Sequence, residues 1–267
     1  MNDMAACPPA FIDLGLRLAD AAAAVVRRYF RTPVAVDDKA DASPVTVADR
    51  EAEAAMRRLL AAEVPDHGIY GEEHGVERPD AEYVWVLDPI DGTKAFITGK
   101  PSFGTLIALL HRGRPILGII DQAIIGERWL GAAGRPTMLN DAPARVRACP
   151  DLGRAALYST GPEIFSGDEV AAFERLRGAV KLTRYGADCY AYGLLAAGFV
   201  DVVAEASLQP YDYCALIPVI EGAGGIVTDW TGGRLGLTRN ARVLAAGDAR
   251  THAQAMAALA GDRSRKE

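Results

Sequence analysis

The sequence has few cysteines, few aromatic residues and no long hydrophobic run. Its four cysteines lie far apart without a CxxC pair, which excludes a disulfide framework and a thiolate zinc site and favours a reducing compartment. Aromatic residues make up 7% of the chain, and its apolar runs are too short to span a bilayer. The four histidines show neither HxH nor HExxH spacing, so a histidine zinc site is also disfavoured.

Positive charge is not in excess either. Lys and Arg number 29 against 35 Asp and Glu, which leaves a net charge of −6, and no basic stripe stands out. Nucleic acid is therefore disfavoured as the main ligand. Residues 1–4 (MNDM) lack the basic start and the apolar stretch of a signal peptide, so we expect a cytoplasmic protein with no membrane partner. What remains is an ordinary globular composition over 267 residues.

The first half of the chain changes character near residue 83. Apolar residues at helical spacing predict helices over 11–30 and from about Asp49 to a stop before Pro65, and the polar stretch 32–48 between them suits a loop. Short apolar runs between turn signals predict strands at residues 83–87, 105–111, 115–121 and 127–130. Residues 136–150 carry three prolines and are the best candidate for a boundary between halves.

In the second half, predicted strands alternate with predicted helices. The strands are expected at residues 155–159, 181–184, 200–204, 226–228 and 242–246. The helices are expected at residues 168–176, 189–197, 212–221 and 249–260. We therefore expect an α+β half over residues 1–140 and an α/β half over residues 141–267.

The segment 85–93 (WVLDPIDGT) places two carboxylates, Asp88 and Asp91, at the end of a buried strand. Gly92 lets the backbone approach a ligand closely, and the amides of Gly92 and Thr93 are free to face an anion. Mg²⁺ takes oxygen ligands and phosphate needs N–H donors, so the segment suits a magnesium–phosphate site. An Asp-Pro turn followed by a helix-capping aspartate explains the same residues without a ligand.

Three further acids occur near predicted element ends. Glu72 follows Gly71 after a short apolar pair, although the pair Glu72-Glu73 could equally be solvated. Asp212 precedes an apolar helix and Asp49 begins one, and both positions also suit a helix cap. Each acid is uninformative alone, and their combination is what carries weight.

Together these motifs resemble the inositol monophosphatase superfamily, in the family's order and over nearly the whole chain. The motifs are GEE at 71–73, DPIDGT at 88–93, YD at 211–212 and EGAGG at 221–225. Residues 103–108 and 184–193 are most similar to the histidinol-phosphate phosphatases of this type. Lys94 replaces a threonine usual in inositol monophosphatases, and Tyr211 replaces a tryptophan, and both departures favour that branch. The resemblance implies a layered αβαβα sandwich and a homodimer.

The same resemblance implies a Mg²⁺-dependent phosphomonoesterase with two or three metal ions. The implied metal ligands are Glu72, Asp88, Asp91, Asp212 and the carbonyl of Ile90. Glu72 also counts as catalytic, together with Thr93 and Asp49, which would help to deprotonate the attacking water. The amides of Gly92 and Thr93 would hold the phosphate oxygens.

The leaving group would meet Arg184, Asp188 and Glu205. Histidinol phosphate carries an ammonium and an imidazole, so Asp188 is the best discriminator, because a neutral polyol would gain less from a carboxylate. Lys39 resembles a loop residue that reaches toward the metals in this superfamily, and a solvated lysine explains it at least as well.

The leading hypothesis is hydrolysis of L-histidinol phosphate in histidine biosynthesis. An inositol-1-phosphate or broad-specificity sugar-phosphate phosphatase is the alternative. A member that only binds RNA polymerase or RNA is disfavoured, since all the metal-site acids are present and the net charge of −6 gives no help with RNA.

Overall fold

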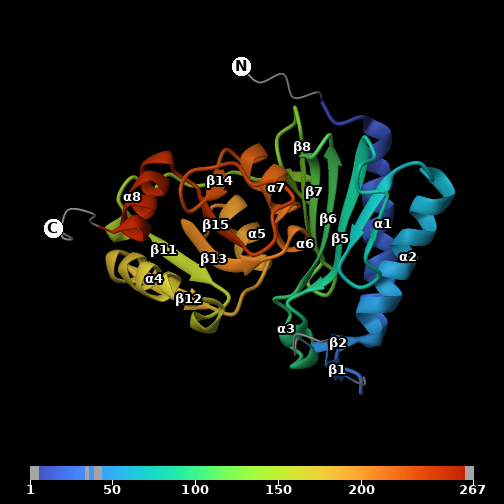
Figure 1. Cartoon of the computed structure of the whole chain (residues 1–267), viewed down its shortest axis with the longest axis horizontal. Coiled ribbons are helices and arrows are strands. Elements are labelled where there is room, and N and C mark those ends of the chain that lie inside the picture. The colour runs from blue at the N-terminus through green and yellow to red at the C-terminus, as the bar shows by residue number, and fades with distance from the viewer. Residues whose placement is uncertain (1–5, 34–35, 39–43, 262–267) are drawn as a thin grey trace.

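The chain folds into five layers in the order αβαβα (Figure 1). The computed structural model describes residues 6–33, 36–38 and 44–261, and Lys39 lies outside these ranges. None of the helices in the described part of the chain combines the length and apolar character that crossing a bilayer requires.

The first sheet carries the segment with the two aspartates. In spatial order its described strands are β10 (Ala142–Pro143), β9 (Met138–Leu139), β8 (Glu127–Ala132), β7 (Arg114–Gln122), β6 (Gly104–His111), β5 (Tyr83–Asp91), β3 (Gly68–Gly71) and β4 (Val76–Glu77). β3 and β5 run parallel, and the other neighbours are antiparallel. A parallel pair brings the ends of β3 and β5 to the same edge of the sheet.

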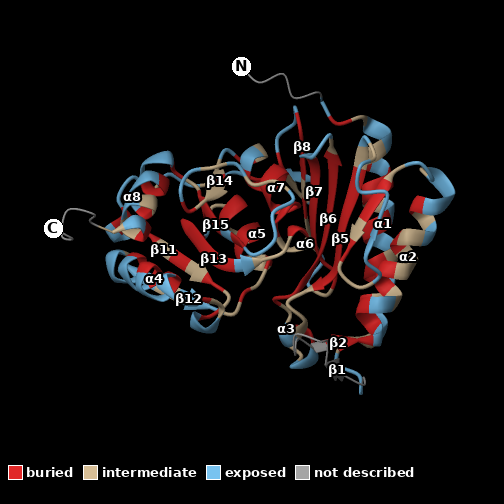
Figure 2. Cartoon of the chain, in the orientation of Figure 1, coloured by how far each residue is buried: buried red, intermediate tan, exposed pale blue. Residues whose placement is uncertain are grey.

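Helices α1 (Pro9–Tyr29) and α2 (Val47–Glu63) cover the outer face of this sheet (Figure 1). Side chains alternate along β5 as the pleat requires. Trp85 and Leu87 pack against α1 and α2, whereas Val84 and Val86 point into the middle of the molecule. Both faces are therefore buried, which explains the continuous apolar run of β5 (Figure 2).

The second sheet lies across the middle layer from the first. Its described strands, in spatial order, are β12 (Leu182–Tyr185), β11 (Ala156–Ser159), β13 (Val202–Leu208), β15 (Ala241–Ala246) and β14 (Ile226–Asp229). Helices α4 (Asp168–Ala179) and α8 (Ala249–Ala260) cover its outer face, and the 3₁₀ helices η1 (Leu152–Arg154) and η2 (Pro162–Ile164) flank β11 in the chain.

The middle layer consists of α5 (Tyr190–Ala196), α6 (Pro210–Tyr213) and α7 (Leu216–Gly222), which lie between the two sheets (Figure 1). One apolar cluster joins this layer to both sheets and includes Val86 of the first and Val203 of the second. The short helix α3 (Thr93–Ile97) follows β5. This layering confirms the fold class expected from the sequence.

Two local predictions were wrong. The stretch 32–48 is not all loop, because β1 (Val36–Asp38) pairs with β2 (Pro44–Thr46) and α2 already begins at Val47. Pairing satisfies backbone groups that a loop would leave to solvent. The single helix predicted over 212–221 is divided into α6 and α7, because Pro218 has no N–H to donate to the carbonyl of Cys214.

Candidate active site

The end of β5 departs from regular pairing between Asp88 and Asp91, where its register with β6 shifts. Pro89 has no N–H for the ladder, which explains the irregularity. Asp88 is buried and its Oδ1 accepts a hydrogen bond from the Ile90 N–H at 3.1 Å. Asp91 Oδ2 accepts one from the Cys189 N–H at 2.7 Å, so the middle layer helps to hold this carboxylate.

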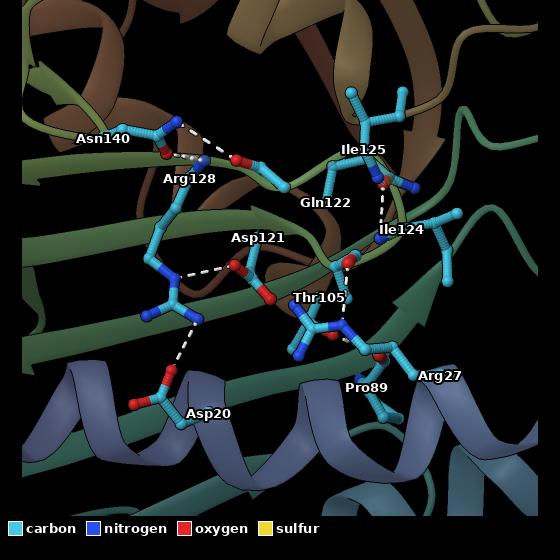
Figure 3. A network of polar contacts seen from close by, with 12 residues as sticks. Asp20, Arg27, Pro89, Thr105, Asp121, Gln122, Ile124, Ile125, Arg128 and Asn140 are labelled. Atoms are coloured by element: carbon cyan, nitrogen blue, oxygen red, sulfur yellow. Dashed lines mark hydrogen bonds and ion pairs between the residues drawn. The ribbon is translucent and has the colours of Figure 1, made fainter.

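Thr105 of β6 supports the irregular segment from the neighbouring strand. Its hydroxyl donates to the Pro89 carbonyl at 2.8 Å (Figure 3). The residue opposite it on β7 is Asp121, whose Oδ1 accepts from Arg128 at 2.7 Å, and Arg128 also reaches Asp20 of α1 at 2.9 Å. A polar network thus ties α1 to the sheet beside the aspartates.

Asp212, far away in the sequence, joins Asp88 and Asp91. Carboxylate oxygens of these three residues lie within 4.8 Å of one another. The N-terminal turn of α6 fixes Asp212, because its Oδ2 accepts from the Gln209 N–H at 2.7 Å. The two aspartates of β5 and the one of α6 therefore converge, and their role as metal ligands stays a prediction.

Burial and mutual repulsion dominate the electrostatics of this cluster. Burial, and then the charges of neighbouring carboxylates, raise the pKa values of Asp88 and Asp91 well above their usual range. Burial likewise raises the pKa of Asp212 to about 8, and the charge of Glu72 adds to the shift. Glu72 also raises the pKa of Asp88, which puts it beside the cluster. Such crowding of acids calls for a compensating cation.

The donor set fits magnesium. It consists only of oxygen atoms, which Mg²⁺ requires, and it contains more carboxylates than a buried site tolerates without a counter-charge. Glu72, Asp88, Asp91, Asp212 and the Ile90 carbonyl remain the predicted ligands.

Asp49 and Thr93 meet at the start of α2 and α3. Asp49 Oδ2 accepts from the Thr46 N–H at 2.9 Å, which completes a capping box, while Oδ1 lies 3.4 Å from Thr93 Oγ1. Thr93 Oγ1 is also 3.2 Å from the Ile90 carbonyl. Burial raises the pKa of Asp49. The capping role and the predicted contact with Thr93 thus belong to different oxygens of one carboxylate.

Gly92 and Asp188 are packed against each other. Gly92 has φ +85°, and a Cβ on it would lie 2.7 Å from Asp188 Cγ, so only glycine fits here. Asp188 Oδ2 lies 3.3 Å from Ser102 Oγ. Burial raises the pKa of Asp188, and the positive charge of Lys100 opposes the shift. The structure therefore brings Asp188 to the turn that carries the predicted phosphate-binding amides.

The other two predicted substrate residues differ from Asp188. Glu205 is buried, and its carboxylate oxygens already accept from the Thr160 N–H and the Tyr192 hydroxyl, both at 2.8 Å. Arg184 is exposed on the edge strand β12 and, within the described ranges, its side chain makes no hydrogen bond or ion pair. No contact thus links Arg184 to the acidic cluster.

Sequence reasoning missed two residues that support the site, Thr105 and Glu53. Glu53 is buried under the Glu72 loop, which comprises residues 72–75 between β3 and β4. Its position four residues after Asp49 and four before Arg57 was an available signal, since such residues share a helix face. Thr105 had no comparable signal, because a threonine within a strand is common.

Comparison with known proteins agrees with this fold. The model of the inositol monophosphatase family matches residues 10–265. The bifunctional phosphatase IMPL2, chloroplastic, of Arabidopsis thaliana is 54% identical over 258 residues, which cover 93% of this chain and 75% of that protein. A histidinol-phosphatase of Chlorobaculum parvum is 34% identical, with 83% of this chain and 86% of that protein covered.

A structure of an inositol monophosphatase from Zymomonas mobilis superposes with a TM-score of 0.87 at 48% identity, and covers 94% of this chain and 98% of its own. The chain belongs to the inositol monophosphatase family.

Proposed function

We propose that this phosphatase of the inositol monophosphatase family hydrolyses L-histidinol phosphate to L-histidinol and phosphate, with magnesium as its cofactor. The observation that supports this choice of substrate is the position of Asp188. Its carboxylate lies against Gly92, beside the amides proposed to hold the phosphate, where a cationic leaving group would benefit from it. The similarity to a histidinol-phosphatase over most of the chain supports the same substrate.

Two or three Mg²⁺ ions would be held by Glu72, Asp88, Asp91, Asp212 and the carbonyl of Ile90. When bound, magnesium supplies positive charge opposite the phosphate oxygens and lowers the pKa of water. The chain's own part is to hold these oxygens in one place. Asp91 and Asp212 are fixed by backbone N–H donors, and Asp88 by its own turn.

The remaining chemistry is proton transfer and orientation. Thr93 Oγ1 lies 3.4 Å from Asp49 Oδ1, so its hydroxyl can donate to Asp49 while its lone pairs accept a hydrogen bond from the attacking water. Water loses a proton toward this pair, its oxygen bonds to phosphorus, and the ester P–O bond breaks. The departing oxygen takes a proton from solvent. The amides of Gly92 and Thr93 orient the phosphate.

Substrate discrimination would depend on charge near the leaving group. Asp188 offers a carboxylate to the ammonium or imidazole of histidinol. Because Thr160 and Tyr192 occupy the oxygens of Glu205, that residue would contribute its negative charge rather than a free hydrogen bond. Arg184 stays a prediction with no contact in its support.

The test is phosphate release from L-histidinol phosphate and from inositol 1-phosphate, measured side by side with Mg²⁺ and with EDTA. A large preference for histidinol phosphate that EDTA abolishes is the expected result. Preference for the inositol ester would retain the reaction type and overturn the substrate. Full activity in EDTA would overturn the metal assignment.

An Asp188→Asn variant tests the substrate contact. Loss of a charged hydrogen-bond partner should lower kcat/KM for histidinol phosphate by roughly 10- to 100-fold, and for inositol 1-phosphate much less. Asp168→Asn is the control, since the Asp168 side chain is 83% exposed on α4 and pairs only at the surface. Equal losses on both substrates would remove Asp188 from the discrimination.

An inositol-1-phosphate or broad-specificity sugar-phosphate phosphatase is the second candidate. The Zymomonas mobilis inositol monophosphatase, 48% identical, favours it, as does the description of the Arabidopsis thaliana relative as bifunctional. The substrate comparison above decides between the two. The cytoplasmic location and the homodimer stay predictions.

A further inference from the structure

A buried carboxylate lies directly beneath the loop that carries Glu72. Glu53, on α2, has a side chain with 0% exposure. Its Oε2 accepts from the Glu73 N–H at 2.7 Å, and its Oε1 accepts from the His74 N–H at 3.1 Å. One side chain therefore holds the two peptide groups that immediately follow Glu72.

Arg57 completes this arrangement from the next turn of α2. Its Nε donates to Glu53 Oε1 at 2.7 Å, and its other nitrogens reach Glu77 Oε1 at 2.6 Å and the Gly75 carbonyl. The guanidinium thus supplies the counter-charge that a buried carboxylate needs and also closes the far side of the loop.

Gly71 shows how closely the loop is fitted to Glu53. A Cβ on Gly71 would lie 2.0 Å from Glu53 Oε1 and 2.6 Å from Arg57 Nη2, so these side chains occupy the space of any larger residue. On the other side, the Glu72 N–H donates to the Leu87 carbonyl at 3.1 Å, next to Asp88. The backbone on both sides of Glu72 is therefore fixed.

We infer that Glu53 is a positioning residue, which sets the metal affinity of the site by holding the Glu72 loop in place. The inference rests on the proposed function, in which Glu72 is a metal ligand. A ligand whose backbone is held beforehand loses less conformational freedom when the metal binds. Helix α2 then serves the site twice, with Asp49 facing Thr93 and, one turn later, Glu53 facing the loop.

A purely structural role for the Glu53–Arg57 pair predicts something different. Loss of the pair would then lower the stability of the protein and leave metal affinity unchanged. The two roles separate when Mg²⁺ binding is measured on substrate-free protein, because that measurement requires neither turnover nor the identity of the substrate.

The experiment is calorimetric titration of Mg²⁺ into substrate-free wild type, Glu53→Gln, Gly71→Ala and the double variant. The amide introduced by Glu53→Gln would turn an NH₂ group toward a backbone N–H, so we expect a metal Kd that is roughly 10- to 100-fold weaker, the usual effect of losing a partner around a metal ligand. Gly71→Ala retains the Glu53 carboxylate but displaces it, so this variant should also weaken Mg²⁺ binding. The double variant should lose less than the product of both effects.

Glu63→Gln is the matched control. Glu63 is the last residue of α2 and pairs with Arg17 at the surface, so its loss should leave the metal Kd unchanged. Thermal melts of the metal-free proteins identify the variants that fold. If Glu53→Gln does not fold, the metal Kd of Gly71→Ala tests the inference. Wild-type affinity in the folded variants would overturn the inference and leave the proposed function intact. Absence of binding in wild type would overturn the metal site, and the inference with it.

Discussion

Two regions of this protein bury aspartates in opposite ways. In the second sheet, Asp201 is buried, yet it accepts two hydrogen bonds of 2.6 Å from Arg147 and one of 2.7 Å from the Ala156 N–H. Burial alone would raise its pKa, but these partners lower it below the usual value. At the end of β5, burial and neighbouring carboxylates raise the pKa values of Asp88 and Asp91 instead.

The difference lies in the counter-charge. Asp201 has Arg147 in contact, and Glu53 and Asp121 also have an arginine, although burial outweighs Arg128 and raises the pKa of Asp121. Within the described ranges, no lysine or arginine forms an ion pair with Asp88, Asp91 or Asp212. We therefore expect Asp201, which has its own arginine and lies away from the cluster, to act in stability, whereas the acids gathered without an arginine retain the capacity to bind a cation. Four predictions test this contrast.

Asp91→Asn should have the largest effect. Removal of one charged oxygen donor from the cluster should lower turnover by more than about 100-fold, beyond the usual loss for partners that only surround a metal. The metal-free protein should melt at the same temperature or a few degrees higher, because one crowded charge is gone. Steady-state kinetics and calorimetry measure both effects. Substantial activity, or a lower melting temperature, would contradict the assignment of Asp91 to a cation site.

Asp201→Asn should reverse this pattern. It removes charge-assisted hydrogen bonds from Arg147, so the free energy of unfolding should fall by about 1.5–3 kcal/mol. The metal affinity should stay as in the wild type. Urea unfolding and a Mg²⁺ titration test the two halves of this prediction. If metal affinity fell in step with stability, the distinction between the two kinds of aspartate would fail.

Thr105→Val should give a smaller change, and it should affect both stability and turnover. The variant keeps the shape of the side chain and loses the donor to the Pro89 carbonyl, so it should cost about 1 kcal/mol of stability. It should also lower turnover several-fold, because Pro89 lies between the two aspartates of β5. Thr98→Val, at the C-cap of α3, provides a control threonine whose hydroxyl donates to the Lys94 carbonyl rather than to β5. An effect on stability without any on turnover would limit Thr105 to the fold.

His67 extends the contrast from acids to a base and should show the smallest effect. Burial lowers the pKa of His67, and its Nδ1 accepts from the Trp85 indole at 3.2 Å, so the folded protein favours the neutral ring. The unfolded chain then binds the proton more readily, and stability should fall as the pH drops below about 6.5. Urea unfolding at several pH values should show this slope in the wild type and a shallower one in His67→Gln. Equal slopes would remove His67 from the effect.

Local signals predicted most elements and the acids at their ends, whereas the five layers were expected only from the family resemblance. Apolar periodicity and turn residues are local signals, and they marked most helices and strands of both sheets. The ends of two of those elements bear Asp88 and Asp212, so the acids were predicted together with the elements. The family motifs then indicated that acids far apart in the chain belong to one site. Composition and spacing alone left that question open.

What the sequence could not predict depends on contacts between distant residues. The pairing of β1 with β2 depends on partners that are not adjacent in the sequence, and the break before α7 depends on Pro218 within an apolar stretch. The role of Glu53 becomes visible only when Gly71 is packed against it. Asp49 shows a further difficulty, because its capping function and its contact with Thr93 produce the same sequence pattern.

The site is assembled from two layers of the fold. Asp88 and Asp91 belong to one sheet, whereas Asp212 and the Cys189 N–H come with the helices that both sheets enclose. Separation of these layers would disperse the acids, so bound metal should favour the closed assembly by mass action. Amide hydrogens of α5 to α7 should therefore exchange more slowly with Mg²⁺ present, even far from the carboxylates. Bound metal would then stabilise the contact between the first sheet and the middle layer, in addition to its part in the reaction.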